Sequence, residues 1–405
     1  MFKDTKSEHD QIISANSKVV RNINRGNILH CIREQQPISR ADIARATRLN
    51  KTTVSSIVSG LVKDNLLTET VQRNASIGRN PIGLQLKRGI NFFGAISIDS
   101  GTTRVAVVDV DGSIRDTDKI ATGRGSAKEF MEESIALLMH LKVRSGLSHL
   151  KGVGVSIAGI VDPVQRQVVF APNLGWYNVS IGEVLAQYFS ESCVTAVEND
   201  ANSAALAEMW FGRHRVMLSN FIFLSVGRGI GAGIVIERRI LSGESYFAGE
   251  FGHMMLVEGG EQCACGNHGC WEAYASDQAT VRRYRKARGL GESGSELTID
   301  DVIAAANAGE LAAIQELKST GYWLGVGIAN MVKAVDPSTI IVGGHITRVW
   351  DVIATDVIAS AHRRSFTGDG RGPAIVATSL VKRPSLLGAA ALAMSKSFGE
   401  VRVTR

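Results

Sequence analysis

The sequence predicts an α/β protein in two unlike parts, a small basic helical segment at residues 1–90 and a larger two-lobed α/β body after it. Residues 1–90 hold 15 Lys and Arg against 7 Asp and Glu, a net charge of +8, while the other residues sum to −2. Apolar residues recur at helical spacing in the first part, whereas short apolar strands joined by glycine-rich turns dominate the second. A pattern of strand, glycine turn and strand occurs at 92–110 and again at 221–243, which indicates an internal duplication.

Length and composition are those of a folded protein with two or three domains. The chain has 405 residues, of which 44% are hydrophobic and 21% are charged. Its N-terminus is polar and lacks an apolar signal core, and no run of about 18 apolar residues is present. We therefore expect a cytoplasmic protein with no membrane partner.

Three helical patterns followed by two strand patterns fill residues 1–90. The first helix is expected around residues 19–33, and Ser39 and Asn50 are placed as N-caps of the second and third helices, since both residue types favour that position. The second helix is short, the turn after it is tight, and the third helix carries small polar residues at its N-terminus. This arrangement is typical of a helix-turn-helix. The strand pair encloses a basic, glycine-bearing loop, which predicts a wing.

The net charge and the polar helix face predict that residues 1–90 bind DNA. Short hydroxyl and amine side chains approach base edges and phosphates closely, and the arginines of a wing can reach a phosphate or a minor groove. The candidate DNA contacts are Arg40, Asn50, Lys51, Thr52, Thr53, Ser55, Ser56, Arg73 and Arg79. The alternative is a small helical protein-binding module, which the coincidence of basic charge and polar face disfavours.

The duplicated pattern divides the body into lobes at 91–210 and 211–382, with a final apolar helix within 383–405 packing back on the first lobe. In a glycine turn after a strand, backbone N–H groups can point at phosphate oxygens. The candidate phosphate or nucleotide positions are Asp99, Gly101, Thr103, Gly227, Gly229, Gly343 and Gly344. Tight hairpin turns explain the same glycines equally well.

Asn199 and Asp200 lie where a strand is expected to end and a helix to begin. Both residue types are preferred N-caps. The second possibility is that the carboxylate accepts a proton or a hydrogen bond from a ligand hydroxyl at the mouth of a cleft. The local sequence leaves both possibilities open.

Three of the five cysteines fall within eight residues, which favours a metal site over disulfides in a cytoplasmic chain. With a histidine ten positions upstream, they supply three thiolates and one imidazole, the donor set of a four-coordinate structural zinc. The expected ligands are His253, Cys263, Cys265 and Cys270. His268 is a competing ligand, but it lies inside the turn of the knuckle. Unligated thiols are the alternative, and they would have to stay protonated at this spacing.

Four segments carry a resemblance to a known family: residues 37–58, PNLGW at 172–176, ENDANSAALAE at 198–208, and the zinc segment, E-x-G-H…C-x-C-G-x-x-G-C-x-E. On these motifs the chain resembles the ROK family (repressors, open reading frames, kinases) over nearly its whole length, and it looks like the family's transcription regulators. The resemblance implies a winged helix-turn-helix followed by a two-lobed actin-like or hexokinase (ribonuclease H-like) body with a structural zinc knuckle. It also implies the sugar contacts Asn173, Asn199, Asp200, Glu250, His253 and Glu272, with His253 binding zinc through one ring nitrogen and sugar through the other.

The resemblance leaves two functions to compare. The first is a repressor of sugar-metabolism genes that binds operator DNA as a homodimer or homotetramer and is controlled by a sugar, a sugar phosphate or a protein partner. The second is an ATP-dependent sugar kinase, in which Asp200 would be the catalytic base. The family's kinases carry D-x-G-G-T-K and G-T-G in their phosphate loops, whereas this chain has Thr102 and Arg228 in place of a glycine and a threonine. Both departures argue against ATP and Mg²⁺ and favour the repressor.

Overall fold

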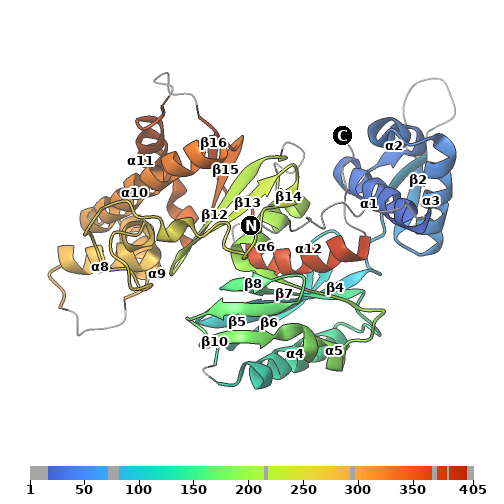
Figure 1. Cartoon of the computed structure of the whole chain (residues 1–405), viewed down its shortest axis with the longest axis horizontal. Helices are drawn as coiled ribbons and strands as arrows, with labels where there is room; N and C mark the ends of the chain where they lie inside the picture. The colour runs from blue at the N-terminus through green and yellow to red at the C-terminus, as the bar shows by residue number, and fades with distance from the viewer. Residues whose placement is uncertain are drawn as a thin grey trace, which may run out of the picture. The chain divides into compact units, whose positions relative to one another are not determined.

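A computed structural model describes residues 17–71, 82–123, 125–213, 218–291, 297–366, 372–380 and 383–398. The chain forms two compact units, one of residues 1–90 with 395–405 and one of residues 91–394. Figure 1 shows helices around a small sheet in the first unit and two larger sheets in the second.

The described residues of 1–90 form three helices and a three-stranded sheet of order β1-β3-β2. Its elements are α1 (Ser17–Gln35), β1 (Ile38–Ser39), α2 (Arg40–Thr47), α3 (Lys51–Lys63), β2 (Leu67–Val71) and β3 (Ile82–Leu86). The Ser39 side chain accepts a hydrogen bond from the N–H of Asp42, and Asn50 accepts one from Thr53, so both predicted caps are confirmed. Arg48 turns the chain between the two helices with a φ of 55°. The helix-turn-helix prediction is therefore confirmed.

The second unit is built on two five-stranded sheets of the same topology. The first has the order β11-β7-β4-β5-β6, in which β4 to β6 form an antiparallel meander and β7 and β11 extend the other edge of β4 as parallel strands. The second, β14-β13-β12-β15-β16, repeats this plan with β12 to β14 as the meander. The repetition confirms the duplication predicted from the two strand-and-glycine patterns. The strands are β4 (Phe92–Ile98), β5 (Thr102–Asp109), β6 (Ile114–Ala121), β7 (Gly152–Ile157), β11 (Val194–Asn199), β12 (Phe221–Val226), β13 (Ile230–Ile236), β14 (Arg239–Ile240), β15 (Thr339–Gly344) and β16 (Ala374–Ala377).

Each sheet is covered by helices that bury their apolar faces on it. Phe130, Ile135 and Leu138 of one helix are buried on the first sheet, and Leu324 and Ile328 of another belong to the core of the second sheet. Burial of such side chains stabilises each lobe by about 1.5–3 kcal/mol per residue. The covering helices are α4 (Ala127–Arg144), α5 (Ile181–Tyr188), α8 (Asp277–Ala287), α9 (Ile299–Asn307), α10 (Leu311–Val335) and α11 (Trp350–His362).

Two helices, α6 (Asp200–Phe211) and α12 (Pro384–Phe398), lie between the two sheets (Figure 1). Glycines let them approach their neighbours closely. A Cβ at Gly233 would overlap the carbonyl oxygen of Ala201 on α6, and one at Gly388 of α12 would overlap that of Ser203. A backbone oxygen cannot move aside as a flexible side chain can, so these contacts require glycine.

One segment differs from its expected form. The segment KGVGVSIAGIVD (residues 151–162) has the apolar pattern that predicts a single strand, but the chain breaks after β7, and β8 (Ile160–Asp162) joins a separate small sheet with β9 (Gln167–Ala171) and β10 (Trp176–Ser180). The break is at Gly159, where a Cβ would crowd the backbone of Phe170 and Ala171. In the described part of the chain, no helix is long and apolar enough to cross a membrane.

Candidate functional site

The candidate ligand site lies at the carboxyl ends of the parallel strands of both sheets. Asp99 follows β4, Asn199 and Asp200 stand at the junction of β11 and α6, and Gly227 and His345 follow β12 and β15. Ligand sites of open α/β sheets form at this edge, because the strands end there and their loops diverge. The duplicated topology thus brings residues from distant parts of the chain to one site.

Asp200 carries a perturbed carboxyl group at this edge. Burial, together with smaller contributions from the neighbouring carboxylates of Asp99 and Glu250, raises its pKa from the usual 3.8 to about 7. Asp99 belongs to the first lobe and Glu250 to the second, so Asp200 lies close to acidic groups of both lobes. A carboxyl group that titrates near neutrality can accept a proton or a hydrogen bond from a ligand hydroxyl.

Asn199 acts as an N-cap in this structure. Its Oδ1 accepts hydrogen bonds from the N–H groups of Ala201 at 2.8 Å and Asn202 at 3.1 Å, and its Nδ2 donates to the carbonyl of Gly159 at 2.9 Å. The side chain therefore fixes the start of α6 and holds the loop between β7 and β8 against it. Any contact with a ligand would come in addition to this structural role.

A cavity of about 1490 Å³ opens beside this edge and extends along α8. Asp99, Gly227, Arg228, Asp277 and His345 are among its lining residues. His345 and Asp277 form an ion pair in its wall, with 3.2 Å between Nδ1 and Oδ2, and this bond raises the pKa of the imidazole. The volume exceeds that of typical small-molecule sites, about 300–1000 Å³.

Glycine at these turns has structural reasons that do not involve a ligand. Gly227 has open space around its Cα, but a Cβ at Gly229 would overlap the carboxylate of Glu272. A Cβ at Gly343 would overlap the ring of Phe223, and Gly344 has a φ of +103°. The Gly343-Gly344 pair is therefore explained by packing and backbone conformation alone.

In the first glycine turn, at residues 99–103, the candidate phosphate residues Gly101 and Thr103 have different surroundings. Gly101 is surrounded by open space. Thr103 is fully buried, and its hydroxyl lies 3.0 Å from that of Thr122, which itself donates to the carbonyl of Asp99. The Thr103 hydroxyl thus bonds within the sheet and does not face the cavity.

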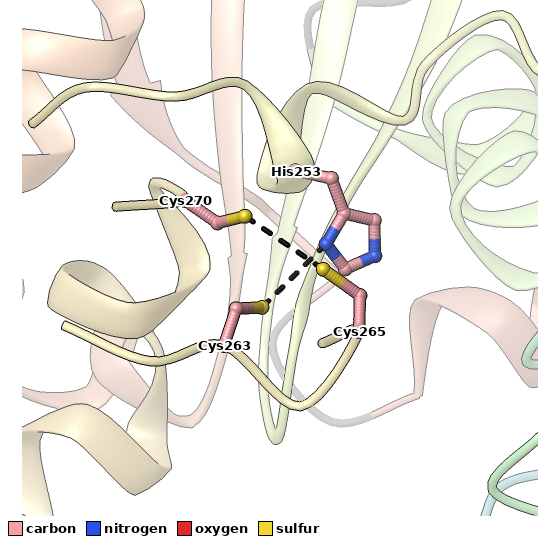
Figure 2. A group of neighbouring side chains, drawn as sticks. All are labelled: His253, Cys263, Cys265 and Cys270. Atoms are coloured by element: carbon pink, nitrogen blue, oxygen red, sulfur yellow. Dashed lines mark hydrogen bonds between the residues drawn. The ribbon is translucent and has the colours of Figure 1, made fainter. Parts of the chain in front are cut away.

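The four predicted metal ligands come together in the second lobe. His253 ends the short 3-10 helix η1 (Phe251–His253), Cys263 and Cys265 belong to the loop after it, and Cys270 precedes α7 (Glu272–Ala275). One ligand atom from each residue lies within 4.8 Å of the others. The Sγ of Cys263 is 3.7 Å from the Nδ1 of His253, and the Sγ atoms of Cys265 and Cys270 are 3.7 Å apart (Figure 2).

These distances fit a single tetrahedral zinc ion. Zn–S bonds of about 2.3 Å place two sulfurs of a tetrahedron about 3.8 Å apart. Burial raises the pKa of Cys263 to about 12 and also raises that of Cys270, so thiolates at these positions need a bound cation. The Nε2 of His253 points away from the three cysteines and lies 4.0 Å from the Oε2 of Glu250. Only one of the two ring nitrogens, Nδ1, therefore faces the cysteines.

Two further predicted sugar contacts differ in their surroundings. Glu272 is half-buried beside Cys263, whereas Asn173 is exposed in the turn between β9 and β10. Burial raises the pKa of Glu250 above its usual value, although the His253 imidazole beside it acts in the opposite direction. Glu250, His253 and Glu272 therefore lie together beside the cysteines. The structure shows no contact between Asn173 and these three residues.

The predicted DNA contacts cluster at the N-terminus of α3. Lys51, Thr52, Ser55 and Ser56 are exposed, while Val54, Ile57, Val58 and Leu61 on the opposite face are buried in the core of the first unit. Thr53 is half-buried and bonds to the Asn50 cap. Arg40 pairs with Glu69 of β2 at 2.8 Å, and Arg73 and Arg79 lie outside the described residues.

Sequence profiles match both parts of the chain. The profile described as the ROK family matches residues 95–396. This chain belongs to the ROK family. The profile described as the MarR family matches residues 22–71, which hold the helix-turn-helix. The resemblance identified from the motifs is confirmed.

Individual ROK proteins are similar over most of their length. The xylose repressor of Bacillus spizizenii is 29% identical over 393 residues, which are 96% of this chain and 99% of the repressor. A glucokinase of Streptomyces coelicolor is 33% identical over 317 residues, 74% of this chain and 96% of the kinase. A crystal structure described as a ROK family transcriptional regulator, a homologue of the E. coli MLC protein, superimposes with a TM-score of 0.80 at 25% identity, covering 94% of this chain and 98% of that one.

Sequence reasoning missed three polar residues of the body. Asp277 and His345 form the ion pair in the large cavity, and Glu208 is a fully buried carboxylate near the end of α6. Glu208 is the last residue of the motif ENDANSAALAE, and an acidic residue within the apolar latter part of α6, AALAEMWF, is the signal that could have found it. Asp277 and His345 are 68 positions apart, and neither has a local pattern that predicts the pair.

Proposed function

We propose that this protein is a sugar-responsive transcription repressor that binds operator DNA through α3 and its wing. The observation that carries the proposal is the exposed polar N-terminus of α3, within a unit of net charge +8 over residues 1–90, in a chain that also has a sugar-kinase-like body. Its similarity to the xylose repressor over 96% of this chain supports the same function. The same proposal includes a cytoplasmic location, because a repressor acts where its operator DNA lies.

We assign domains and contacts on this basis. The DNA-binding domain is residues 1–90, the lobes are 91–210 and 211–382, and the helix within 383–405 packs back on the first lobe. DNA is contacted by the exposed residues at the start of α3, with Arg40, Arg73 and Arg79 adding phosphate or minor-groove contacts. Sugar is contacted by Asn173, Asn199, Asp200, Glu250, His253 and Glu272.

The knuckle ligands His253, Cys263, Cys265 and Cys270 are proposed to hold a structural zinc ion. Zinc with three thiolates and one imidazole has no open position, so it supplies structural stability and no catalysis. The Nδ1 of His253 faces the cysteines, which leaves Nε2 to donate to or accept from a sugar hydroxyl beside Glu250. The metal site thereby fixes the orientation of a sugar contact.

Control by sugar requires that the ligand bind two lobe arrangements with different affinities. A sugar held between Asp200 of the first lobe and Glu250 of the second favours one arrangement of the lobes. In a homodimer or homotetramer, a change in the body alters how well two DNA-binding units match paired half-sites. Such coupling is reciprocal, so operator DNA weakens sugar binding by the same factor as sugar weakens DNA binding.

The second candidate function is an ATP-dependent sugar kinase, and Asp200 is the observation that favours it. Its pKa of about 7 suits a general base. Thr102 and Arg228 replace small residues of the kinase phosphate loops, and the Thr103 hydroxyl bonds to Thr122. These features argue against phosphoryl transfer from ATP. An assay of sugar-dependent ADP release distinguishes the two functions, because a kinase releases ADP and loses that activity in Asp200→Asn.

The proposal is tested by fluorescence anisotropy of a labelled DNA fragment from upstream of the protein's own gene. The protein is titrated at fixed salt, with and without D-xylose, D-glucose, N-acetyl-D-glucosamine and their phosphates. We expect saturable binding that one of these ligands weakens by about tenfold or more, a coupling of about 1.4 kcal/mol. Binding to this fragment no tighter than to unrelated DNA, together with sugar-dependent ADP release, would replace the repressor by the kinase.

A further inference from the structure

Glu208 links helix α6 to the turn that follows β16. It is 0% exposed although it carries a carboxylate. The Thr378 hydroxyl donates a hydrogen bond to its Oε1, and the Ser379 hydroxyl donates one to its Oε2 at 3.4 Å. A buried carboxylate without hydrogen-bond donors is costly, so these bonds hold residues 378–379 against α6.

The partners of Glu208 are themselves fixed to other elements. The N–H of Thr378 donates to the carbonyl of Val342 on β15 at 2.7 Å. The N–H of Arg213, just after α6, donates to the Ser379 hydroxyl at 3.0 Å, and the N–H of Leu380 donates to the Thr378 hydroxyl at 3.0 Å. We call Glu208, Thr378 and Ser379 the carboxylate clamp. It joins the end of α6 to the second sheet and to the turn at 378–380.

The clamp lies where the two connections between the lobes meet. The chain first passes from β11 through α6 to β12, and it later leaves β16 by the turn at 378–380 and enters α12. The start of α12 is tied to the first sheet, because the Ser385 and Ser97 hydroxyls lie 3.0 Å apart and Arg383 donates to Thr117 at 3.1 Å. The clamp therefore joins the first of these two connections between the lobes to the second.

The start of α6 lies at the candidate ligand site. Asn199 caps the helix and Asp200 is its first residue. Eight positions of α-helix separate Asp200 from Glu208, a distance of about 12 Å along the axis. A helix of this length moves as a rigid body, so a displacement of its first residue also displaces Glu208.

We propose that Glu208 is a positioning residue that transmits sugar binding at the start of α6 to the turn at 378–380 and so to α12. This inference rests on the proposed sugar-responsive function and names the element through which that response passes. Glu208 does not touch the sugar. It acts only by keeping the turn at 378–380, in the second connection between the lobes, attached to α6 in the first. Loss of the clamp uncouples the turn from the sugar site without removing a sugar contact.

Hydrogen–deuterium exchange of the full-length protein tests this transmission. Exchange of the amides of residues 378–380 is measured with and without a saturating sugar, using whichever of D-xylose, D-glucose and N-acetyl-D-glucosamine binds in a calorimetric titration. We expect the sugar to change these exchange rates by about threefold or more in the unmodified protein. In Thr378→Val, which keeps the side-chain shape but removes the hydroxyl, the sugar should bind within about twofold of its normal affinity while the change at 378–380 disappears.

Three further variants separate transmission from general damage. Glu208→Met removes both acceptors and should behave like Thr378→Val, whereas Glu208→Gln retains an oxygen acceptor for Thr378 and should restore the sugar-dependent change. Thr280→Val removes a buried hydroxyl that bonds to Thr320 at 2.6 Å in the same lobe, and it should leave the change intact. An unaltered response at 378–380 in Thr378→Val or Glu208→Met overturns the inference, as does the absence of any response in an unmodified protein that binds sugar. A protein that binds none of the three sugars overturns the proposed function and the inference with it.

Discussion

The Oε2 of Glu272 accepts a hydrogen bond from the backbone N–H of Ile230 at 2.9 Å. Glu272 follows the last cysteine of the knuckle by two positions, and Ile230 begins β13 just after the second glycine turn. The other oxygen of the same carboxylate, Oε1, lies 3.7 Å from the Sγ of Cys263. One side chain thus joins the candidate metal site to the glycine turn, and the turn needs Gly229 because a Cβ there would overlap the carboxylate.

This relationship predicts opposite outcomes at the two glycines of the turn. Gly229→Ala should displace Glu272, break its bond to Ile230 and weaken sugar binding by about tenfold or more, since a charged acceptor contributes about 1.5–3 kcal/mol. Gly227→Ala is the matched control, because open space surrounds its Cα and its sugar affinity should stay within about twofold. Calorimetric titration of both variants measures the difference. Equal losses in both would mean that the turn itself contacts the ligand.

Local sequence was sufficient for the features that depend on neighbouring residues. Ser39 and Asn50 act as caps through bonds to residues three positions away, so residue type and position predict them. The knuckle is equally local, because its three cysteines lie within eight residues of one another. The repeated strand-and-glycine pattern predicted the duplicated lobes, since each copy specifies its own antiparallel meander.

The remaining features depend on pairs that the sequence does not place together. Glu208 and Thr378 are separated by 170 positions, and no local pattern indicates that the turn after β16 reaches α6. Gly343 is predicted as a nucleotide position, yet the ring of Phe223 on the neighbouring strand already explains the missing side chain. For Asn199 the sequence allows both a cap and a ligand contact, and only the folded structure shows its bonds to Ala201 and Gly159.

Removing one knuckle thiolate should remove the metal. Cys265→Ser leaves three donors where structural zinc requires four, so we expect loss of about one zinc per chain and a lower unfolding temperature. Cys193→Ser is the control, because Cys193 is half-buried in the first lobe, away from the cluster. Zinc content by atomic absorption and thermal unfolding are measured on the same samples. Full zinc content in Cys265→Ser would contradict its assignment as a ligand.

Lys51 should contact a DNA phosphate. It is exposed at the first position of α3, where the helix N-terminus also favours an anion. Lys51→Ala should weaken operator binding by about tenfold at low salt and reduce the salt dependence by about one released counterion. Lys63→Ala, at the other end of the same helix, also removes an exposed charge and should change neither quantity appreciably. Anisotropy titrations at several salt concentrations check both, and identical salt slopes for the two variants would place Lys51 outside the interface.

Asp200 should make the stability of the ligand-free protein depend on pH. Its pKa is raised to about 7 in the folded protein from about 3.8 in the unfolded chain, so between these values the folded state holds a proton that the unfolded state has lost. This contribution is fully present below about pH 4, and it is lost as the pH rises through about 7. The free energy of unfolding should therefore fall with rising pH by up to about 1.4 kcal/mol per unit in this window.

Asp200→Asn cannot titrate at this position, so it isolates the effect from that of other groups. Urea unfolding at pH 5 and pH 8 should show the variant gaining stability relative to the unmodified protein as the pH rises. The same substitution removes a charged acceptor for a sugar hydroxyl, and it should weaken sugar binding at pH 8 by about tenfold or more. Sugar binding favours the ionised carboxylate, so the unmodified protein should lose affinity as the pH falls below about 7, whereas Asp200→Asn should not. Parallel stability curves for the two proteins would show that Asp200 ionises at its ordinary pKa, and the surroundings of Asp99 and Glu250 would then not perturb it.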